Sequence, residues 1–215
     1  PISYKDDATA FDGRKKGHIV GKGELNNRIS GIFFRYLAER GVPSHYIREL
    51  SPTEQLVQHV TILPIEVVVR NIAAGSLAKR LGMEEGTTLR HAVVEMYYKD
   101  DELGDPLINE SHISVLELAT EEQVQEMKRQ ALQVNDLLQQ YLQGRRVILV
   151  DFKLEFGLTA SGELLLADEI SPDTCRFWDA DTREKLDKDR FRQDLGNVKQ
   201  AYEEILERLG GHSRE

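Results

Sequence analysis

Two apolar runs separated by a turn of small residues are the feature that most constrains the fold of this chain. The runs cover residues 147–150 and 164–167, and residues 159–162 between them read TASG. Short apolar runs on either side of a small-residue turn are typical of two antiparallel strands. The sequence therefore predicts a β-hairpin here, with charged residues directly after each apolar run.

The charged residues of the first strand should lie together. Side chains of a strand alternate between its two faces, so Asp151, Lys153 and Glu155 share one face. If Ser161-Gly162 forms a two-residue loop, Asp168 lies directly opposite Glu155 on the second strand. Two carboxylates in this position have Cβ atoms about 5 Å apart and repel each other. The pair therefore needs a cation, a shared proton or a different register.

A divalent cation is one solution for the facing carboxylates. Mg²⁺ prefers oxygen ligands and commonly takes one or two carboxylates together with substrate phosphates. The alternative is a register shifted by one residue, which places Ala167 opposite Glu155 and turns Asp168 to the other face. Three more ionisable groups follow the second strand: Glu169, Asp173 and Arg176. This crowding favours a magnesium site held by Glu155 and Asp168.

Length and charge limit the classes of function. The 215 residues suit one large domain or two small lobes. The net charge of −9 argues against a broad nucleic-acid surface, which needs clustered Lys and Arg. No apolar run approaches the roughly 18 residues of a membrane helix, the first residues do not resemble a signal peptide, and the single cysteine, Cys175, cannot form an internal disulfide. We therefore expect a cytoplasmic protein that binds neither nucleic acid nor membranes.

Residue spacing predicts further helices and strands. Apolar residues at helical intervals predict helices at 24–40, 121–143 and 191–209, the second of them beginning at a capping box formed by Thr120 and Gln123. Shorter β-prone runs predict strands at 44–50, 55–62, 65–71 and 88–99. A turn at Leu63-Pro64 should separate two of these strands, and short turns favour an antiparallel arrangement. We expect these strands to form a second sheet, distinct from the hairpin.

The residues after the strand at 65–71 are suited to bind an anion. Arg70 precedes a run of small residues, and Ser76 is placed to act as the N-cap of a short helix. Helix N-termini present unpaired N–H groups that attract phosphates. The alternative is a capped helix beside a solvated arginine. His112 and the Gly21-Lys22-Gly23 run are interpreted as structural.

Four segments carry motifs that identify a family when they occur together. They read VVVRNIAAGSLAKRLG at 67–82, DPLINESH at 105–112, LVDFKLEFG at 149–157 and ADEISPDTCRFWD at 167–179. In this order they closely resemble the SAICAR synthetase family, over nearly the whole chain. The resemblance implies an α+β fold of two lobes, related to ATP-grasp enzymes, with antiparallel sheets and packed helices. It also implies an ATP-dependent ligase of purine biosynthesis that joins carboxyaminoimidazole ribonucleotide to L-aspartate and forms ADP and phosphate.

The resemblance also implies roles for individual residues. Glu155 and Asp168 match acids that hold Mg²⁺ on the ATP phosphates, and Lys99 matches a lysine near ATP. The groups that match holders of the ribonucleotide 5′-phosphate are Arg70, Ser76 and Arg176. The candidate catalytic residues are Lys153, between the metal and the substrate carboxylate, Asp12, in a loop beside the imidazole and aspartate sites, and Asp151. Asp105 and Asp173 lie in matching motifs without an assigned contact.

We expect the chain to form two lobes. We expect an N-terminal antiparallel lobe at residues 1–64 and a C-terminal lobe with helices that holds ATP and substrate at 65–215. Family members usually open with a hairpin carrying a G-K-x-K motif, which we expect to be missing here. A nucleotide-binding protein without turnover and another small-molecule ATP-dependent ligase or kinase stay open as functions, and a homodimer stays open as the assembly.

Overall fold

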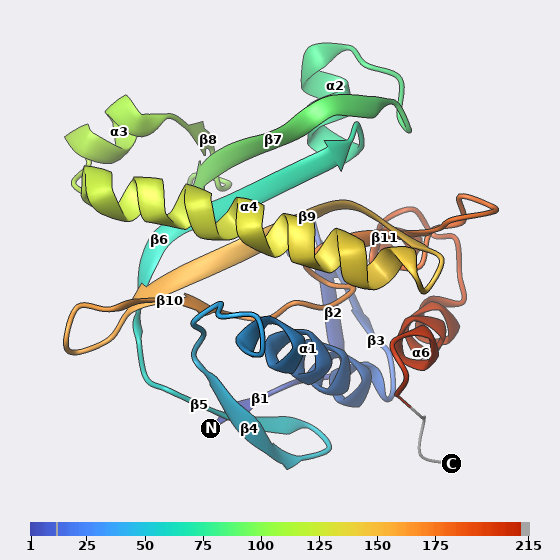
Figure 1. The fold of residues 1–215 in the computed structure, drawn as a ribbon. Coiled ribbons are helices and arrows are strands. Elements are labelled where there is room, and N and C mark those ends of the chain that lie inside the picture. Colours follow the sequence, from blue (N-terminus) through green and yellow to red (C-terminus); the bar gives the residue numbers. More distant parts are fainter. Residues whose placement is uncertain (12, 212–215) are drawn as a thin grey trace.

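A six-stranded antiparallel sheet forms the centre of the computed structural model, which describes residues 1–11 and 13–211 (Figure 1). Its strands are β6 (Thr61–Ile72), β7 (Thr88–Tyr98), β8 (Leu107–Ile108), β9 (Val147–Leu158), β10 (Leu164–Ala167) and β11 (Cys175–Asp179). They follow the order β10-β9-β6-β7-β8, and β11 pairs with the same edge of β9 as β10 does. The loop from β10 to β11 therefore runs along one edge of β9.

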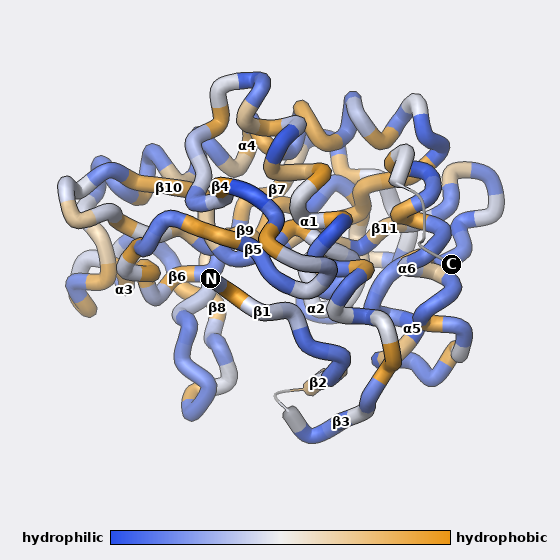
Figure 2. Tube along the Cα trace, turned by 90° about the horizontal axis from the view of Figure 1, so that it is seen from below, coloured by the Kyte–Doolittle hydropathy of each residue, from blue (hydrophilic) through white to orange (hydrophobic). Residues whose placement is uncertain are grey.

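Two smaller sheets and a set of helices surround the central sheet. One small sheet has the order β1 (Ile2–Ser3), β5 (Glu54–Val57), β4 (Tyr46–Ser51), and the other is the hairpin of β2 (Asp7–Ala10) and β3 (Lys15–His18). Figure 2 shows this hairpin at the lower edge of the molecule. The helices are α1 (Lys22–Ala38), α2 (Gly75–Leu81), α3 (Glu110–Val115), α4 (Glu121–Gln143), α5 (Asp189–Arg192) and α6 (Val198–Arg208). The predicted α+β class is confirmed.

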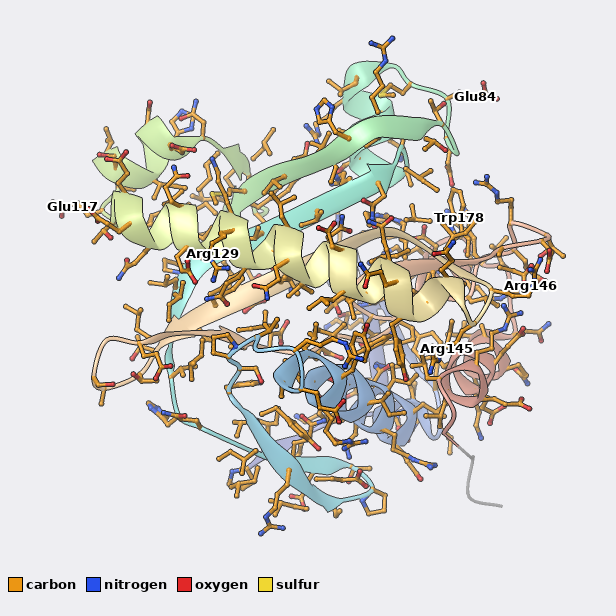
Figure 3. All side chains as sticks on the ribbon, viewed as in Figure 1. Glu84, Glu117, Arg129, Arg145, Arg146 and Trp178 are labelled. Atoms are coloured by element: carbon orange, nitrogen blue, oxygen red, sulfur yellow. The ribbon has the colours of Figure 1, made fainter. Side chains whose placement is uncertain are left out.

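The central sheet has an apolar face and a polar face. Phe152 and Leu154 of β9 are buried in one core with the apolar side of α4, which lies across the sheet (Figure 1). Arg129, on the far side of α4, points into solvent (Figure 3). Because strand side chains alternate, Asp151 and Lys153 lie on the opposite face of the sheet. The polar face is thus the one that α4 does not cover.

The predicted start of α4 is confirmed. The Thr120 hydroxyl accepts a hydrogen bond from the Gln123 backbone N–H at 3.2 Å, and the Gln123 side-chain oxygen accepts one from the Thr120 N–H at 2.9 Å. This capping box satisfies two N–H groups that a helix end leaves unpaired. His112 has a similar structural role, because its Nδ1 accepts the Asn109 backbone N–H in the capping box of α3. None of the helices in the described ranges is long and apolar enough to cross a membrane.

The predicted turn at Leu63-Pro64 is wrong, and so is the separate sheet for residues 65–71. Pro64 lies inside β6, which continues to Ile72. A proline lacks a backbone N–H, and the register of β6 against β9 shifts between Ile62 and Glu66, on either side of it. Beyond this irregularity β6 pairs directly with β9, so the residues at 65–71 share a sheet with the hairpin.

The predicted single helix at 191–209 is also wrong, because the chain breaks it in two. α5 ends at Arg192 and α6 begins at Val198. Between them Asp194, Gly196 and Asn197 have left-handed φ values of 56°, 69° and 53°. Left-handed residues interrupt a right-handed helix. The apolar spacing spans this interruption, and so periodicity alone does not reveal it.

The predicted register of the hairpin is wrong by one residue. Ala167, and not Asp168, lies opposite Glu155. The loop has three residues instead of two: the Thr159 N–H donates to the Glu163 carbonyl at 2.9 Å, and Gly162 has a φ of 86°. A three-residue loop ending in a left-handed glycine is a common hairpin type. The hairpin therefore has the alternative register, in which Asp168 is not paired with Glu155.

We predict that Gly157→Ala destabilises the fold by about 1–3 kcal/mol. A Cβ at residue 157 would lie 2.8 Å from Val60 Cβ and 3.1 Å from the Thr61 carbonyl oxygen. Chemical denaturation measures the loss. Gly144→Ala is the matched control, because a Cβ there has no heavy atom of the described chain within 4 Å and φ is −67°. It should be neutral or stabilise by up to about 1 kcal/mol; equal unfolding free energies for the two variants would contradict the close approach at Gly157.

Candidate active site

The ammonium group of Lys153 is surrounded by carboxylates on the polar face of the sheet. Its Nζ lies 3.0 Å from Glu66 Oε1, 2.8 Å from Glu155 Oε1 and 3.6 Å from Asp168 Oδ2. Burial alone would lower the pKa of this ammonium, but attraction to the three carboxylates outweighs burial and raises it above the usual range. Lys153 is therefore charged at neutral pH and supplies the cation that the facing acids require.

Glu66 is a member of this cluster that the sequence did not reveal. It lies directly opposite Glu155 on the neighbouring strand β6. The sequence predicted that Asp168 would face Glu155, but in the structure Glu66 takes that place. Lys153 donates to both carboxylates of this facing pair. The sequence signal for Glu66 was its position in β6, where it is a single acidic residue within an apolar run. That signal becomes specific only once β6 is known to pair with β9.

Asp168 reaches the cluster in spite of the shifted register. It directly follows β10 with a left-handed φ of 56°, and its carboxylate comes within 3.6 Å of Lys153 Nζ. Burial, followed by repulsion from Glu155, raises the pKa of Asp168 to about 6. Lys99 approaches from the end of β7, with its Nζ 2.7 Å from Glu155 Oε1. Burial opposes the charge of Glu155, but Lys153 and Lys99 hold its pKa below the usual range.

A second cluster joins two arginines through one carboxylate. Asp151 Oδ2 lies 2.9 Å from Arg70 Nη1 and 3.0 Å from Arg176 Nη1, and Asp151 and Arg176 are directly opposite on β9 and β11. Arg70 also donates to Glu95 at 2.7 Å and to the Ser76 hydroxyl at 3.1 Å. The structure thus brings together Arg70, Ser76, Arg176 and Asp151, all of which the sequence singled out.

The predicted N-cap role of Ser76 is wrong. The N-cap of α2 is Ala74, without a side-chain hydrogen bond, and Ser76 lies inside the first turn of the helix. Gly75 before it has a φ of 52°, and a Cβ there would lie 2.9 Å from Arg176 Cζ. Only glycine therefore lets the Arg176 guanidinium lie against this turn.

A cavity of about 620 Å³ is lined by residues from both clusters. Lys153 lines it together with Arg70, Asp151 and Arg176. The opposite wall includes residues of the β2–β3 hairpin on either side of Asp12, which itself lies outside the described residues. Other charged groups in the lining are Asp101, Asp105, Asp173, Lys188 and Arg192. Arg192 lies in the helix predicted at 191–209 and Lys188 just before it, and the sequence analysis assigned a functional role to neither.

Two lining residues have their chemistry fixed by burial and neighbours. Both oxygens of Asp173 are engaged, one by Lys22 Nζ at 2.7 Å and the other by the Tyr202 hydroxyl at 2.5 Å. Lys22 is thus a buried ion-pair partner of Asp173 at the start of α1, in line with the structural interpretation of the Gly21-Lys22-Gly23 run. Burial raises the pKa of the Cys175 thiol well above its usual range, so this cysteine is not an activated nucleophile.

Comparisons with known proteins identify the family to which this chain belongs. A family model described as SAICAR synthetase matches residues 1–209. A phosphoribosylaminoimidazole-succinocarboxamide synthase from Brevibacillus brevis is 67% identical over 98% of this chain and 88% of its own length. The chain belongs to the SAICAR synthetase family. Its members are ATP-dependent ligases of purine biosynthesis that form a carbon–nitrogen bond, and this chain is an enzyme of that class.

Solved SAICAR synthetases have the same fold. One that was determined in complex with ADP is 51% identical, with a TM-score of 0.96 over 99% of this chain and 91% of the other. One from Pyrococcus horikoshii OT3 is 50% identical, with a TM-score of 0.95 over 99% of this chain and 93% of the other. The predicted SAICAR synthetase-like fold is therefore confirmed.

We predict that the carboxyl group of Asp168 titrates near pH 6 in the protein without nucleotide or metal. Its pKa is raised because burial and Glu155 disfavour the anion, so the proton leaves about two pH units later than from an ordinary aspartate near 4. Carbon-13 NMR of labelled aspartate carboxyls measures the midpoint, and Asp168→Asn assigns the signal. A midpoint near pH 4 would contradict the packing of Asp168 against Glu155.

Proposed function

We propose that this member of the family joins carboxyaminoimidazole ribonucleotide to L-aspartate while ATP becomes ADP and phosphate. The observation that carries the proposal is one cavity lined by Lys153, the centre of the lysine–carboxylate cluster, and by the arginines Arg70 and Arg176 of the second cluster. The first cluster suits phosphoryl transfer from ATP and the second suits a distant phosphate monoester. A nucleotide with a reactive carboxylate far from its phosphate requires both clusters.

The ATP end comprises Lys99, Lys153, Glu155 and Asp168. Glu155 and Asp168 would hold Mg²⁺, which would offset the negative charge that develops on the ATP phosphates. The donor set fits this ion: two carboxylates already converge on one cation, Lys153. No group of three or more His, Cys, Asp or Glu side chains in residues 1–11 and 13–211 is arranged to hold a metal alone. The two carboxylates alone would leave ligand positions open for substrate phosphates.

The substrate end comprises Arg70, Ser76 and Arg176, which bind the 5′-phosphate of the ribonucleotide. Asp151 fixes the two guanidinium groups relative to each other. The guanidinium groups present N–H donors in a planar fork, which suits a phosphate. Binding energy from this remote phosphate positions the carboxylate at the other end of the cavity.

Lys153 acts where the two ends meet. A carboxylate is a poor electrophile, so its conversion to an acyl phosphate by ATP precedes attack of the aspartate amine. Phosphoryl transfer depends mainly on alignment and charge neutralisation. The Lys153 ammonium lines the cavity and contacts Glu155, so it is placed to draw the substrate carboxylate and the transferred phosphate together. We assign Asp12 to the wall beside the imidazole and aspartate.

The proposal extends to organisation and location. Residues 1–64 form an N-terminal lobe and residues 65–215 a C-terminal lobe that holds ATP and substrate, with β6 crossing from one to the other. The enzyme works in the cytoplasm as a homodimer. Activity that needs only one of the two co-substrates would favour a kinase, and ADP binding without turnover would favour a nucleotide-binding protein.

We predict that ADP release requires both the ribonucleotide and L-aspartate, and that Glu155→Gln and Asp168→Asn each abolish it. Each change removes one negative oxygen ligand without changing the side-chain volume, so the fold should persist. A coupled assay measures ADP, and circular dichroism checks folding. Normal rates in both variants would exclude the proposed metal site.

We predict that Arg176→Ala chiefly raises the KM for the ribonucleotide, by about 10- to 100-fold, because a charge-assisted hydrogen bond contributes about 1.5–3 kcal/mol. The KM for ATP should change little. Steady-state kinetics with each substrate varied in turn gives the two values. An effect confined to ATP would show that Arg176 belongs to the other end of the cavity.

A further inference from the structure

Two cations in the cavity wall have no role in the function proposed above. Lys188 immediately precedes α5, and Arg192 is the last residue of that helix. Both line the cavity that contains Lys153 and Arg176. They lie four positions apart in the chain, on one short segment. The inference below rests on the proposed function and assigns these two residues to the amino-acid substrate.

Lys188 is a partly buried charge that has no direct contact with an acid in the described residues. Within residues 1–11 and 13–211 its ammonium forms no hydrogen bond or ion pair. Burial lowers the pKa of this ammonium. The acids Asp173 and Glu169 attract this ammonium, but neither forms a hydrogen bond or ion pair with it, and both oxygens of Asp173 are taken by Lys22 and Tyr202. An unpaired buried charge costs stability, and an anionic ligand offsets that cost.

Arg192 is held at a fixed position relative to the phosphate-binding cluster. Its Nη1 lies 2.8 Å from Asp189 Oδ1, while the other oxygen of Asp189 lies 2.8 Å from Arg176 Nε. Asp189 itself is buried, and its backbone N–H donates to Asp187 at 2.7 Å. In the part of the chain that the structure describes, Asp189 is the acceptor for Arg192, which leaves the Nε and Nη2 donors of this guanidinium for a ligand.

We propose that Lys188 and Arg192 bind the two carboxylates of L-aspartate and so determine which amino acid the enzyme accepts. L-aspartate is the substrate that brings two carboxylates, and each needs a cationic partner in a cavity of limited solvent access. Asp189 holds Arg192, and both cations lie on one short segment of the cavity wall, so they present a pair of charges whose spacing the protein sets. This arrangement discriminates against glutamate, which is longer by one methylene.

The main test measures the KM for each substrate in Lys188→Met and Arg192→Gln. We expect the KM for L-aspartate to rise by about 10- to 100-fold, the effect of one charge-assisted hydrogen bond, with the KM for the ribonucleotide and for ATP within about twofold. Lys185→Gln is the matched control, because Lys185 pairs with Glu85 and Gln193 and is not among the cavity-lining residues. An unchanged KM for L-aspartate in both variants, or a rise for the ribonucleotide instead, overturns the inference.

Succinate gives a readout that does not depend on turnover. It carries both carboxylates of aspartate without the amine, so it should compete with L-aspartate in the unaltered enzyme and lose about tenfold or more in potency in each variant. Equal inhibition of the variants and the unaltered enzyme overturns the inference. The proposed function fails separately, if the unaltered enzyme releases ADP without any dependence on L-aspartate.

The stability of Lys188→Met separates a ligand-binding role from a structural one. Without substrates, removal of an unpaired partly buried charge should leave the unfolding free energy unchanged or higher. A structural role predicts a lower value. Denaturant unfolding in the absence of substrates measures this difference, and a marked loss of stability would count against the proposed role of Lys188.

Discussion

The contact on which the site depends is the ammonium group of Lys153 between Glu66, Glu155 and Asp168. Three carboxylates at this distance repel each other strongly unless a cation lies among them. Lys153 keeps Glu155 ionised and holds Asp168 close although the hairpin register turns this residue away from the paired position. The same ammonium lines the cavity, so one charge both stabilises the acids and is exposed to the space that we propose for the substrate.

Strand β9 connects this cluster to Arg70 and Arg176, for which we propose phosphate binding. Its alternating residues Asp151, Lys153 and Glu155 form a row on the polar face, and the two ends of the row have different partners. Asp151 fixes Arg70 and Arg176, whereas Glu155 pairs with Lys99 at the end that we propose for the nucleotide. The alternate residues on the other face are buried beneath α4, so the row stands on a rigid core. Distances within the site are therefore set by the strand repeat rather than by flexible loops.

Sequence patterns correctly predicted those structural features that depend on residues close together in the chain. The capping box at Thr120 and the shared face of β9 depend on neighbouring residues, and both are found. The hairpin register depends on the left-handed φ of Gly162, which the composition of the turn did not specify. Glu66 was missed because its place opposite Glu155 results from pairing between strands far apart in the sequence. The resemblance to a family supplied roles, but it did not supply this contact.

The position of the metal tests the central claim most directly. A crystal structure with ADP and Mn²⁺ in place of Mg²⁺ locates the ion by its anomalous scattering. Our account predicts one ion that contacts both Glu155 and Asp168, with the Lys153 ammonium still beside Glu66. An ion bound to neither carboxylate, or a complex in which the two carboxylates lie too far apart to share an ion, would contradict it.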